Sequence, residues 1–562
     1  MNQINGIGPM TYEEFEMNGL TNEEVTYDEE AAYDEEVTYD EEVIHDEEVT
    51  HDKEVTYKRI ASIFQEGNLV LREDQLGKLW LLKLVQVTES RDWIRNDEYA
   101  HKTNFETWCL NWDAVEGHLS KTFMTFTCAK FPGQRSIKSL PVYPIGFQDQ
   151  IEGQNSKKYL AERGKKWWEF IKKSPTCLQH SGLAFGQDRG SFDGEKVRVE
   201  GRVVIDNKSK ASEGIEVILR PNNFRGHNST EPAVSYKPDE LHQYPELNDE
   251  ELSLCPAVIG CYDLKTKNKY LASISNLQAV DWNKDVMKHL VMDKRKKLML
   301  EGLVRHHSDR DLRHDTGDLI AGKGQGLVIL LHGPPGVGKT LTAESIAEAV
   351  QKPLVAMSIG EMVWDETQLQ ERLKSEFQRA IDWNAVLLLD EADVVLEARS
   401  FEDVRRNGIV SIFLRELEYY QGILFLTTNR VNTMDTAFHS RIQIGISFNS
   451  MSSETRAQVW TQLLALNGRD KLIGPEGLQR VQDELSKRKL NGRQIRNVLN
   501  VAEGLAFQEP GAKKDKLTYA HIEEAVGAAL EFQKLLEASK SMMKLEQTVW
   551  ASVTSGDDDA GF

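Results

Sequence analysis

Short apolar segments recur along residues 327–428, and longer stretches with a helical spacing of apolar positions separate them. The apolar segments are 327–331, 354–357, 385–389 and 423–428, the last of which ends in two threonines. Short apolar runs of this kind are typical of parallel strands that are covered on both faces. Between them, residues 341–349 and 368–381 favour helices. This alternation predicts an α/β fold with a parallel sheet.

Residues 58–290 have a different pattern and predict a mixed α+β domain. In 195–206, Val197, Val199, Val203 and Ile205 alternate with polar residues, which indicates a half-buried strand. Residues 160–173 predict a helix with an apolar stripe. We find no catalytic constellation in this region.

The net charge of −21 comes mainly from the N-terminus. Residues 1–57 contain nineteen acidic residues and one basic residue, Lys53, so they carry 18 of the 21 net negative charges. Part of this segment is a repeat with a six-residue period, which matches no helical face, and its dense like charges repel one another. We expect a disordered acidic tail that keeps the protein soluble. A docking tail for a basic partner, or a metal-binding tract that includes His45 and His51, is the alternative.

The five cysteines show no paired metal-ligand spacing, and no apolar run reaches the length of a membrane span. The N-terminus also lacks the pattern of a signal peptide. These features predict an intracellular protein, cytoplasmic or nuclear, without a membrane span.

The most informative motif follows the first apolar run. It reads Gly333-Pro334-Pro335-Gly336-Val337-Gly338-Lys339-Thr340 and continues with Leu341 into a predicted helix. Strand, glycine-rich loop and helix N-terminus in this order direct backbone N–H groups and a positive dipole end toward phosphate. We expect Lys339 to reach the β- and γ-phosphates and the Thr340 hydroxyl to hold Mg²⁺. The sequence therefore predicts a site for a nucleoside triphosphate.

A second motif follows the third apolar run, where Asp390 and Glu391 end the strand. The carboxyl ends of parallel strands share one edge of a sheet, so these acids should lie near the phosphate loop. Asp390 is placed to orient Mg²⁺, and Glu391 is placed to polarise an attacking water molecule.

Taken together, the motifs at 333–340, 390–393 and 427–430 resemble those of AAA+ ATPases. The similarity covers about residues 290–535. The segments 324–342, 386–399 and, more loosely, 140–206 resemble a fungal group of AAA-type ATPases that carries an uncharacterised N-terminal domain. The resemblance implies an AAA+ nucleotide-binding domain at 291–450, a helical lid at 451–540 and a flexible C-terminal tail at 541–562. It places lid helices at 453–466, 483–488, 493–507 and 519–536.

The resemblance also implies roles for single residues. Asn429 corresponds to sensor 1, which helps to hold the attacking water, and Asp318 and Ile320 lie where the family binds adenine. Arg441 corresponds to the arginine finger that reaches the γ-phosphate of a neighbouring subunit. If Arg441 is instead a structural ion-pair partner, another donor such as Arg430 is needed. Arg493 corresponds to sensor 2, in preference to Arg496.

In threading members of the family an aromatic pore loop follows the second strand. Here that region contains Trp364 as its only aromatic residue, with no glycine after it. Trp364 either grips a polypeptide or packs under the next helix, so the sequence does not predict translocation.

Two functions from different classes follow. One is an ATP-hydrolysing machine, a homo-oligomeric ring such as a hexamer, that remodels an unidentified protein client. The alternative is a nucleotide-dependent scaffold in which turnover is incidental. The presence of a water-activating Glu391 favours the first. Nucleic acid is not expected as a partner, because outside the acidic tail the charge is near neutral and forms no basic stripe.

Overall fold

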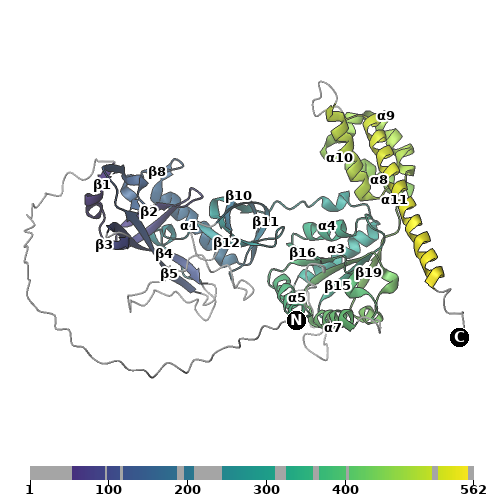
Figure 1. The fold of residues 1–562 in the computed structure, drawn as a ribbon, viewed down its shortest axis with the longest axis horizontal. Helices are drawn as coiled ribbons and strands as arrows, with labels where there is room; N and C mark the ends of the chain where they lie inside the picture. Colours follow the sequence, from purple (N-terminus) through teal and green to yellow (C-terminus); the bar gives the residue numbers. More distant parts are fainter. Residues whose placement is uncertain are drawn as a thin grey trace, which may run out of the picture. The chain divides into compact units, whose positions relative to one another are not determined.

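The computed structural model describes residues 54–94, 98–113, 118–186, 195–207, 244–309, 324–358, 366–399, 404–508 and 517–554. The predicted acidic tail, apart from residues 54–57, lies outside these ranges. The described elements are an N-terminal region of strands and two helices, a parallel sheet covered by helices, and a set of C-terminal helices (Figure 1).

The sheet of the nucleotide-binding region is parallel and has five strands in the order β16-β17-β18-β15-β19. The strands are β15 (Leu327–His332), β16 (Leu354–Ser358), β17 (Val386–Asp390), β18 (Ile423–Thr428) and β19 (Ile444–Ser447). Four of the five were predicted as continuous apolar runs, as a doubly covered sheet requires. Since β18 lies between β15 and β17, the residue after β18 lies between the loops that follow those two strands.

Helices cover both faces of this sheet and make two separate apolar cores. One core joins alternate strand residues to α3 (Lys294–Ser308) and α4 (Lys339–Ala349). The other core joins the remaining strand residues to α5 (Glu366–Asp382), α6 (Asp393–Leu396) and α7 (Val404–Tyr419). In Figure 1, α3 and α4 lie on one side of the strands, and α5 and α7 lie on the other. The result is the α/β sandwich that the sequence predicted.

The N-terminal region begins with an antiparallel sheet in the order β5-β4-β3-β2-β7. Its strands are β2 (Leu69–Glu73), β3 (Leu79–Ile94), β4 (Glu98–Asp113), β5 (His118–Ala129) and β7 (Tyr143–Pro144). Two short pairs accompany it, β1 (Glu54–Thr56) with β6 (Gln134–Ser136), and β8 (Gln150–Ile151) with β9 (Gln154–Asn155).

A second N-terminal sheet closes on itself, because β10 pairs with β11 on one edge and with β13 and β14 on the other. The strands are β10 (Thr176–Gly186), β11 (Lys196–Ile205), β12 (Val258–Asp263), β13 (Lys269–Ser273) and β14 (Leu277–Ala279). Gly182 has a φ of +138° within β10, a value that an L side chain rarely adopts.

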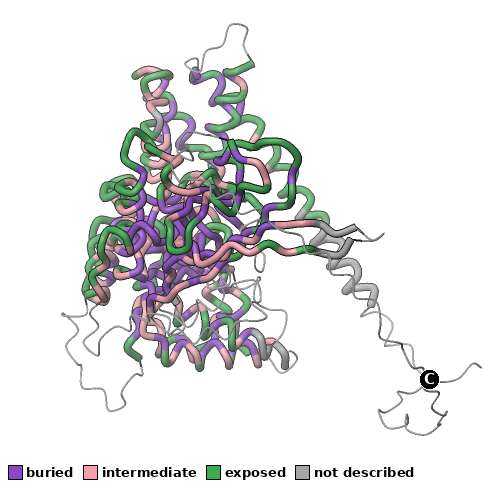
Figure 2. The backbone as a smooth tube through the Cα atoms, turned by 90° about the vertical axis from the view of Figure 1, so that its left-hand side faces the viewer, coloured by how far each residue is buried: buried purple, intermediate pink, exposed green. Residues whose placement is uncertain are grey.

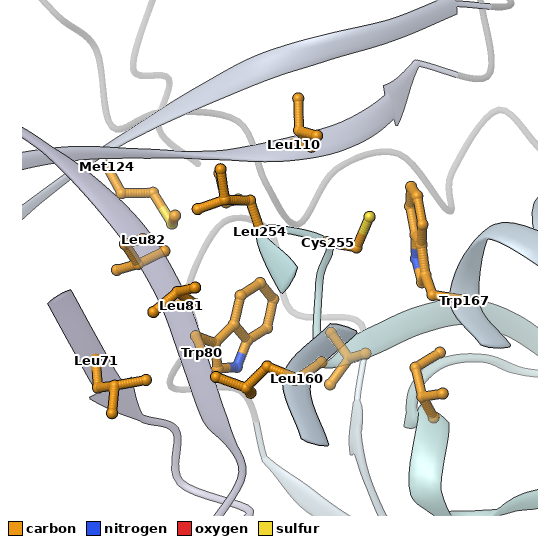
Figure 3. Packing of buried hydrophobic residues seen from close by; sticks show 14 of the residues in the cluster. Leu71, Trp80, Leu81, Leu82, Leu110, Met124, Leu160, Trp167, Leu254 and Cys255 are labelled. Carbon is orange, nitrogen blue, oxygen red and sulfur yellow. The ribbon is translucent and has the colours of Figure 1, made fainter. Parts of the chain in front are cut away.

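Both N-terminal sheets share one apolar core with the helix α1 (Ser156–Lys173) and the short helix α2 (Asp249–Ser253). Figure 3 shows members of this core from both sources, among them Trp80, Leu81 and Leu82 of β3 and Leu160 and Trp167 of α1, with Trp80 beside Leu160. Trp80 and Leu160 are each at most 1 % exposed. The strand at 195–206 and the helix at 160–173 therefore match the sequence prediction, whereas the long strands β3, β4 and β5 were not predicted.

The second N-terminal sheet also packs on the nucleotide-binding region. Val204 and Tyr262 belong to the same buried cluster as α5 and α7. Trp383 donates from Nε1 to Asp206 Oδ2 at 2.7 Å, and its ring centroid lies 5.2 Å from that of Tyr262. Nearby, Arg202 donates from Nη1 to Oε2 and from Nη2 to Oε1 of Glu348 on α4, at 2.6 and 2.7 Å.

The C-terminal helices, predicted as the lid and called the lid below, are α8 (Ser453–Ala465), α9 (Arg469–Asp483), α10 (Gly492–Gln508) and α11 (Tyr519–Thr554). They bury one core that includes Trp460, Val481, Leu499 and Ile522. Figure 2 shows buried positions repeating along the described helices, with exposed residues on the opposite faces.

Two sequence predictions for this region were wrong. The helix predicted at 483–488 is only a 3₁₀ turn at Leu485–Lys487, because the true helix, α9, precedes it. The tail predicted to be flexible from residue 541 is helical to Thr554, because α11 continues through the helix-favouring run 542–547 and keeps its hydrogen-bonded backbone beyond it.

Candidate functional site

The loop between β15 and α4 contains backbone conformations that only glycine adopts readily. Gly333, Gly336 and Gly338 have φ values of +146°, +76° and +102°. A Cβ on Gly333 would come within 2.2 Å of the carbonyl oxygen of Phe448. These backbone angles wrap the loop around the start of α4, whose first residue is Lys339. The first N–H groups of α4 therefore lie at the end of this loop, which is the arrangement of an anion site.

Lys339 places its ammonium group inside the loop. Nζ donates to the carbonyl oxygens of Gly333 and Pro334 at 2.7 and 2.8 Å and to Oδ1 of Asn429 at 2.8 Å. The residue is only 8 % exposed. Burial lowers the pKa of Lys339, and the charge of Arg493 lowers it further, while Asp390, Asp393 and Glu391 oppose this shift. A buried cation among backbone carbonyls and acids is well placed to attract a polyanion.

Asp390 lies at the end of β17 and is bonded from two sides. The Thr340 hydroxyl is 3.1 Å from each carboxylate oxygen, and the Thr427 hydroxyl also donates to Oδ1. Thr427 additionally accepts the backbone N–H of Glu391 at 3.0 Å. The Glu391 side chain is exposed, and its backbone has a φ of +54°. Asp390 and Thr340 thus lie within hydrogen-bond distance of each other, and the adjoining Glu391 is exposed. Their roles toward Mg²⁺ and water stay predictions.

The end of β18 is fixed by Asp393, a residue to which the sequence assigned no role. Its Oδ1 accepts the Thr428 hydroxyl and the backbone N–H of Asn429, the latter at 3.1 Å. This contact fixes the backbone of the exposed Asn429, whose side-chain Oδ1 accepts a hydrogen bond from Lys339. Thr427 and Asp393 were both visible in the motifs, but their roles depend on the register of β18 beside β17, which a sequence does not show.

The lid contributes directly to the loop. The backbone N–H of Gly492, at the start of α10, donates to the carbonyl of Gly336 at 3.0 Å. A Cβ on Gly336 would come within 2.5 Å of Cγ of Asn491, another contact that sequence reasoning missed. The charge of Arg493 acts on Lys339, whereas that of Arg496 acts on Glu344 of α4. The choice of Arg493 over Arg496 as sensor 2 stays a prediction.

Arg441 does not approach Lys339 or Asp390 through any described contact within its own chain. Its guanidinium is bonded to residues of α7 and of the preceding turn, including Glu418 at 3.1 Å. Arg430, the alternative donor, is exposed beside Asn429.

The remaining predicted site residues divide into two groups. Pro334 and Pro335 are exposed on the loop, Val337 is half-buried, and Leu341 is 40 % exposed on the first turn of α4. Asp318, Ile320 and Trp364 lie outside the described residues, so the adenine pocket and the pore loop stay sequence predictions.

The arrangement fits a magnesium–nucleoside triphosphate. The glycine loop and the N-terminus of α4 could hold phosphates, and Thr340 and Asp390 supply the hard oxygen ligands that Mg²⁺ prefers. In the part of the chain that the structure describes, no group of three or more His, Cys, Asp or Glu residues is placed to hold a metal ion without such a ligand. None of the described helices combines the length and the apolar character of a membrane span.

Comparisons with known proteins agree with this geometry. Residues 329–450 match the model of the ATPase family associated with various cellular activities (AAA), and residues 46–149 match a domain of unknown function (DUF7025). The chain is 26 % identical over 203 residues to a putative 26S proteasome regulatory subunit homolog of Methanothermobacter marburgensis, with 34 % of this chain and 53 % of that protein covered. It is 27 % identical over 227 residues to the human ATPase family AAA domain-containing protein 3B, with 38 % and 33 % covered.

A Lon protease of Amoebophilus asiaticus is 25 % identical over 223 residues, with 34 % of this chain and 27 % of the protease covered. The chain thus spans about a quarter to a half of the length of these curated relatives. A solved structure of the FIGL-1 AAA domain in complex with ADP is 21 % identical, covers 42 % of this chain and 82 % of that domain, and has a TM-score of 0.34. From the family match, the homologues and the parallel sheet with its glycine loop, we conclude that residues 329–450 form an AAA+ ATPase domain and that residues 46–149 correspond to a domain of unknown function.

Proposed function

We propose that the chain binds ATP with Mg²⁺ at the 333–340 loop and hydrolyses it, as members of the AAA family generally do. The observation that carries this proposal is the convergence of three strand ends. Lys339 after β15 donates to Asn429 after β18, while Asp390 of β17 bonds to Thr340 of α4 and Thr427 of β18. A scaffold that only bound nucleotide would not require a carboxylate such as Glu391 on the open side of this network.

Each residue has a separate task in the proposed reaction. Lys339 and the N–H groups at the start of α4 would bind the phosphates, and Thr340 and Asp390 would hold the metal ion. ATP would supply the phosphoryl group, and Mg²⁺ would supply positive charge that neutralises the phosphate oxygens. Glu391 would accept a proton from the attacking water, and Asn429 would help to hold that water in line. Arg441 of a neighbouring copy would stabilise negative charge on the phosphate, and Arg493 would do so from the lid.

We further propose that the chain works as a homo-oligomeric ring, such as a hexamer, and remodels a protein client. Membership of the AAA family supports the ring. The exposed Glu391 supports turnover, and the N-terminal region, which has an apolar core of its own, supports a client-binding role. The client is unidentified, and a nucleotide-dependent scaffold is the alternative outcome.

Two variants test the reaction. Lys339→Ala should abolish binding of a fluorescent ATP analogue, because the buried cation of the loop is lost. Glu391→Gln should keep binding and lose phosphate release by roughly 100-fold or more, since general-base catalysis contributes about 10²–10⁴-fold. Exposed residues of α5 serve as matched controls, with Lys374→Ala and Glu371→Gln expected to behave like the wild type.

Normal turnover by Glu391→Gln would refute the assignment of the base. Wild-type protein that binds ATP and forms rings without releasing phosphate would favour the scaffold. If Glu391→Gln rings retain a client, mass spectrometry of the retained protein would identify it.

A further inference from the structure

Arg441 is held by four hydrogen bonds within its own protomer. Nε donates to the carbonyl of Leu414 at 3.2 Å, Nη1 donates to the carbonyl of Ala437 at 2.9 Å, and Nη2 donates to Oε2 of Glu418 at 3.1 Å. Nη1 also lies 3.3 Å from the hydroxyl of Ser440. A guanidinium has five N–H donors, so these contacts leave one N–H of Nη2 for another acceptor.

The backbone that carries Arg441 is fixed as well. The turn Thr436–Ser440 begins at Asp435, whose Oδ1 accepts the N–H of Ala437 at 2.9 Å. The N–H of Arg441 itself donates to the carbonyl of Phe438 at 3.0 Å, and Phe438 is fully buried. The segment is therefore anchored in the core on one side and leaves the Arg441 side chain at the surface, 24 % exposed.

Glu418 differs from the other acceptors because it is charged and lies at the end of α7. Its side chain is 25 % exposed, so water screens the ion pair and the pair contributes little to stability. What the pair does provide is direction, since the planar guanidinium and a carboxylate fix each other's orientation. The carbonyl groups at the carboxyl end of a helix add a favourable potential for the same cation.

We propose that Glu418 is a positioning residue that holds Arg441 in the orientation needed to reach an anionic phosphate group in an adjoining copy of the chain. This inference rests on the proposed function of Arg441 as a donor to a neighbouring site. Glu418 itself does not touch the phosphate. It keeps the guanidinium from adopting other rotamers, so that the remaining N–H of Nη2 is available to a phosphate group when two copies meet. Fixed donors of this kind act without a reorganisation cost during the reaction.

The test is a mixing experiment in which each partner lacks a different half of one interface. Glu418→Ala retains its own Glu391 and loses the positioning of its finger. Glu391→Gln retains Arg441 and Glu418 and loses its own base. We expect Glu418→Ala to lower kcat by roughly 10- to 100-fold, as misplacement of a reacting group by about 1 Å does. KM for ATP should change little, and Arg441→Ala should not lose further activity when Glu418→Ala is added.

When Glu418→Ala is mixed with Glu391→Gln, activity should partly return, because an intact finger then meets an intact site. Glu418→Gln, which keeps an oxygen acceptor without the charge, should fall between wild type and Glu418→Ala. The matched control is Glu416→Ala. Glu416 lies on the same helix and contacts Gln370 at 3.2 Å, with no described contact to Arg441. It should not show the finger defect.

A second readout does not depend on turnover. In the Glu391→Gln background, ATP-dependent assembly is measured by sedimentation velocity, and we expect Glu418→Ala to require a higher protein concentration for the same degree of assembly. The melting temperature of the unassembled protomer should fall by no more than about 2–4 °C, because the ion pair is exposed to solvent.

Three outcomes would overturn the proposal. Higher activity of Glu418→Ala would show that Glu418 sequesters Arg441 instead of positioning it. Mixed assemblies that form without any return of activity would show that Glu418 does not act through the neighbour's site. An equal defect in Glu416→Ala would show a general effect on α7. A wild-type protein without ATP turnover would refute the proposed function, and the assembly measurement would still report on the Glu418–Arg441 pair.

Discussion

Replacing Trp383 by phenylalanine should weaken the attachment of the second N-terminal sheet to the nucleotide-binding region. Trp383 Nε1 donates to Asp206 Oδ2 at 2.7 Å, and the two residues are 6 % and 2 % exposed. A hydrogen bond to a charged group contributes about 1.5–3 kcal/mol, and the smaller ring would leave a cavity that costs about 1 kcal/mol. The two contributions sum to about 2.5–4 kcal/mol, and because Asp206 has a further interaction, we expect a loss of stability in the lower part of this range, about 2.5–3 kcal/mol.

Native-state hydrogen exchange by mass spectrometry measures this effect region by region, which suits a protein of several cores better than one unfolding midpoint. Faster exchange should appear both in β11 and at the end of α5, because the lost bond joins them. The control is Trp108→Phe. Trp108 is half-buried on β4, with the Lys121 ammonium group over its ring, and its replacement should leave the exchange rate of β11 unchanged.

A double-mutant cycle with Asp206→Ala, which removes the acceptor, isolates the pair, and we expect a coupling energy of about 0.5–3 kcal/mol. The reasoning would be refuted if β11 of the Trp383→Phe protein exchanged at the wild-type rate, or if the coupling energy were near zero. In the first case the bond would not join the two regions, and in the second the loss would come from packing.

Two further predictions concern single positions. Gly336→Ala should weaken binding of a fluorescent ATP analogue by about 10-fold or more, because a φ of +76° strains alanine by about 1–3 kcal/mol and the added Cβ would meet Asn491. The control Gly445→Ala, where no atom lies within 4 Å of the added Cβ, should bind the analogue normally. For Glu348, burial raises the pKa, but the bonds from Arg202 and from the N–H of Asn283 outweigh it and hold the pKa below 4.5. The stabilising contribution of ionised Glu348 should therefore be complete above pH 4.5 and decline as the pH falls below that value. The urea midpoints of the wild type and of Glu348→Gln should then converge in acid. A constant difference between the two midpoints down to about pH 3 would contradict this expectation.

The nucleotide-binding region was predictable because its chemistry is local. A doubly covered parallel strand needs consecutive apolar residues, and the glycine loop and Asp390-Glu391 directly follow such strands. The long strands β3, β4 and β5 of the first N-terminal sheet were not predicted, because β4 buries polar residues such as Thr103 and Thr107 and so lacks a regular alternation of apolar and polar residues. Helix α9 was missed since Gly474 and Pro475, which normally end helices, lie within its bounds at a kink.

Within the site, the sequence identified the residues of each motif but not the contacts between motifs. Thr427 supports both Asp390 and Glu391 only because β18 pairs with β17 in one register. The contact of Asn491 with Gly336 joins residues that are far apart in the chain. Both depend on tertiary packing, which the pattern of one segment does not contain.

The contact between the lid and the glycine loop has a kinetic consequence. The N–H of Gly492 supports the carbonyl of Gly336, so α10 cannot move away without releasing that part of the loop. If the loop holds the phosphates of a nucleotide, lid opening and the loosening of the product become a single event. The lifetime of the closed lid would then set how long ADP is retained, and turnover could be limited by this motion instead of by the bond-breaking step.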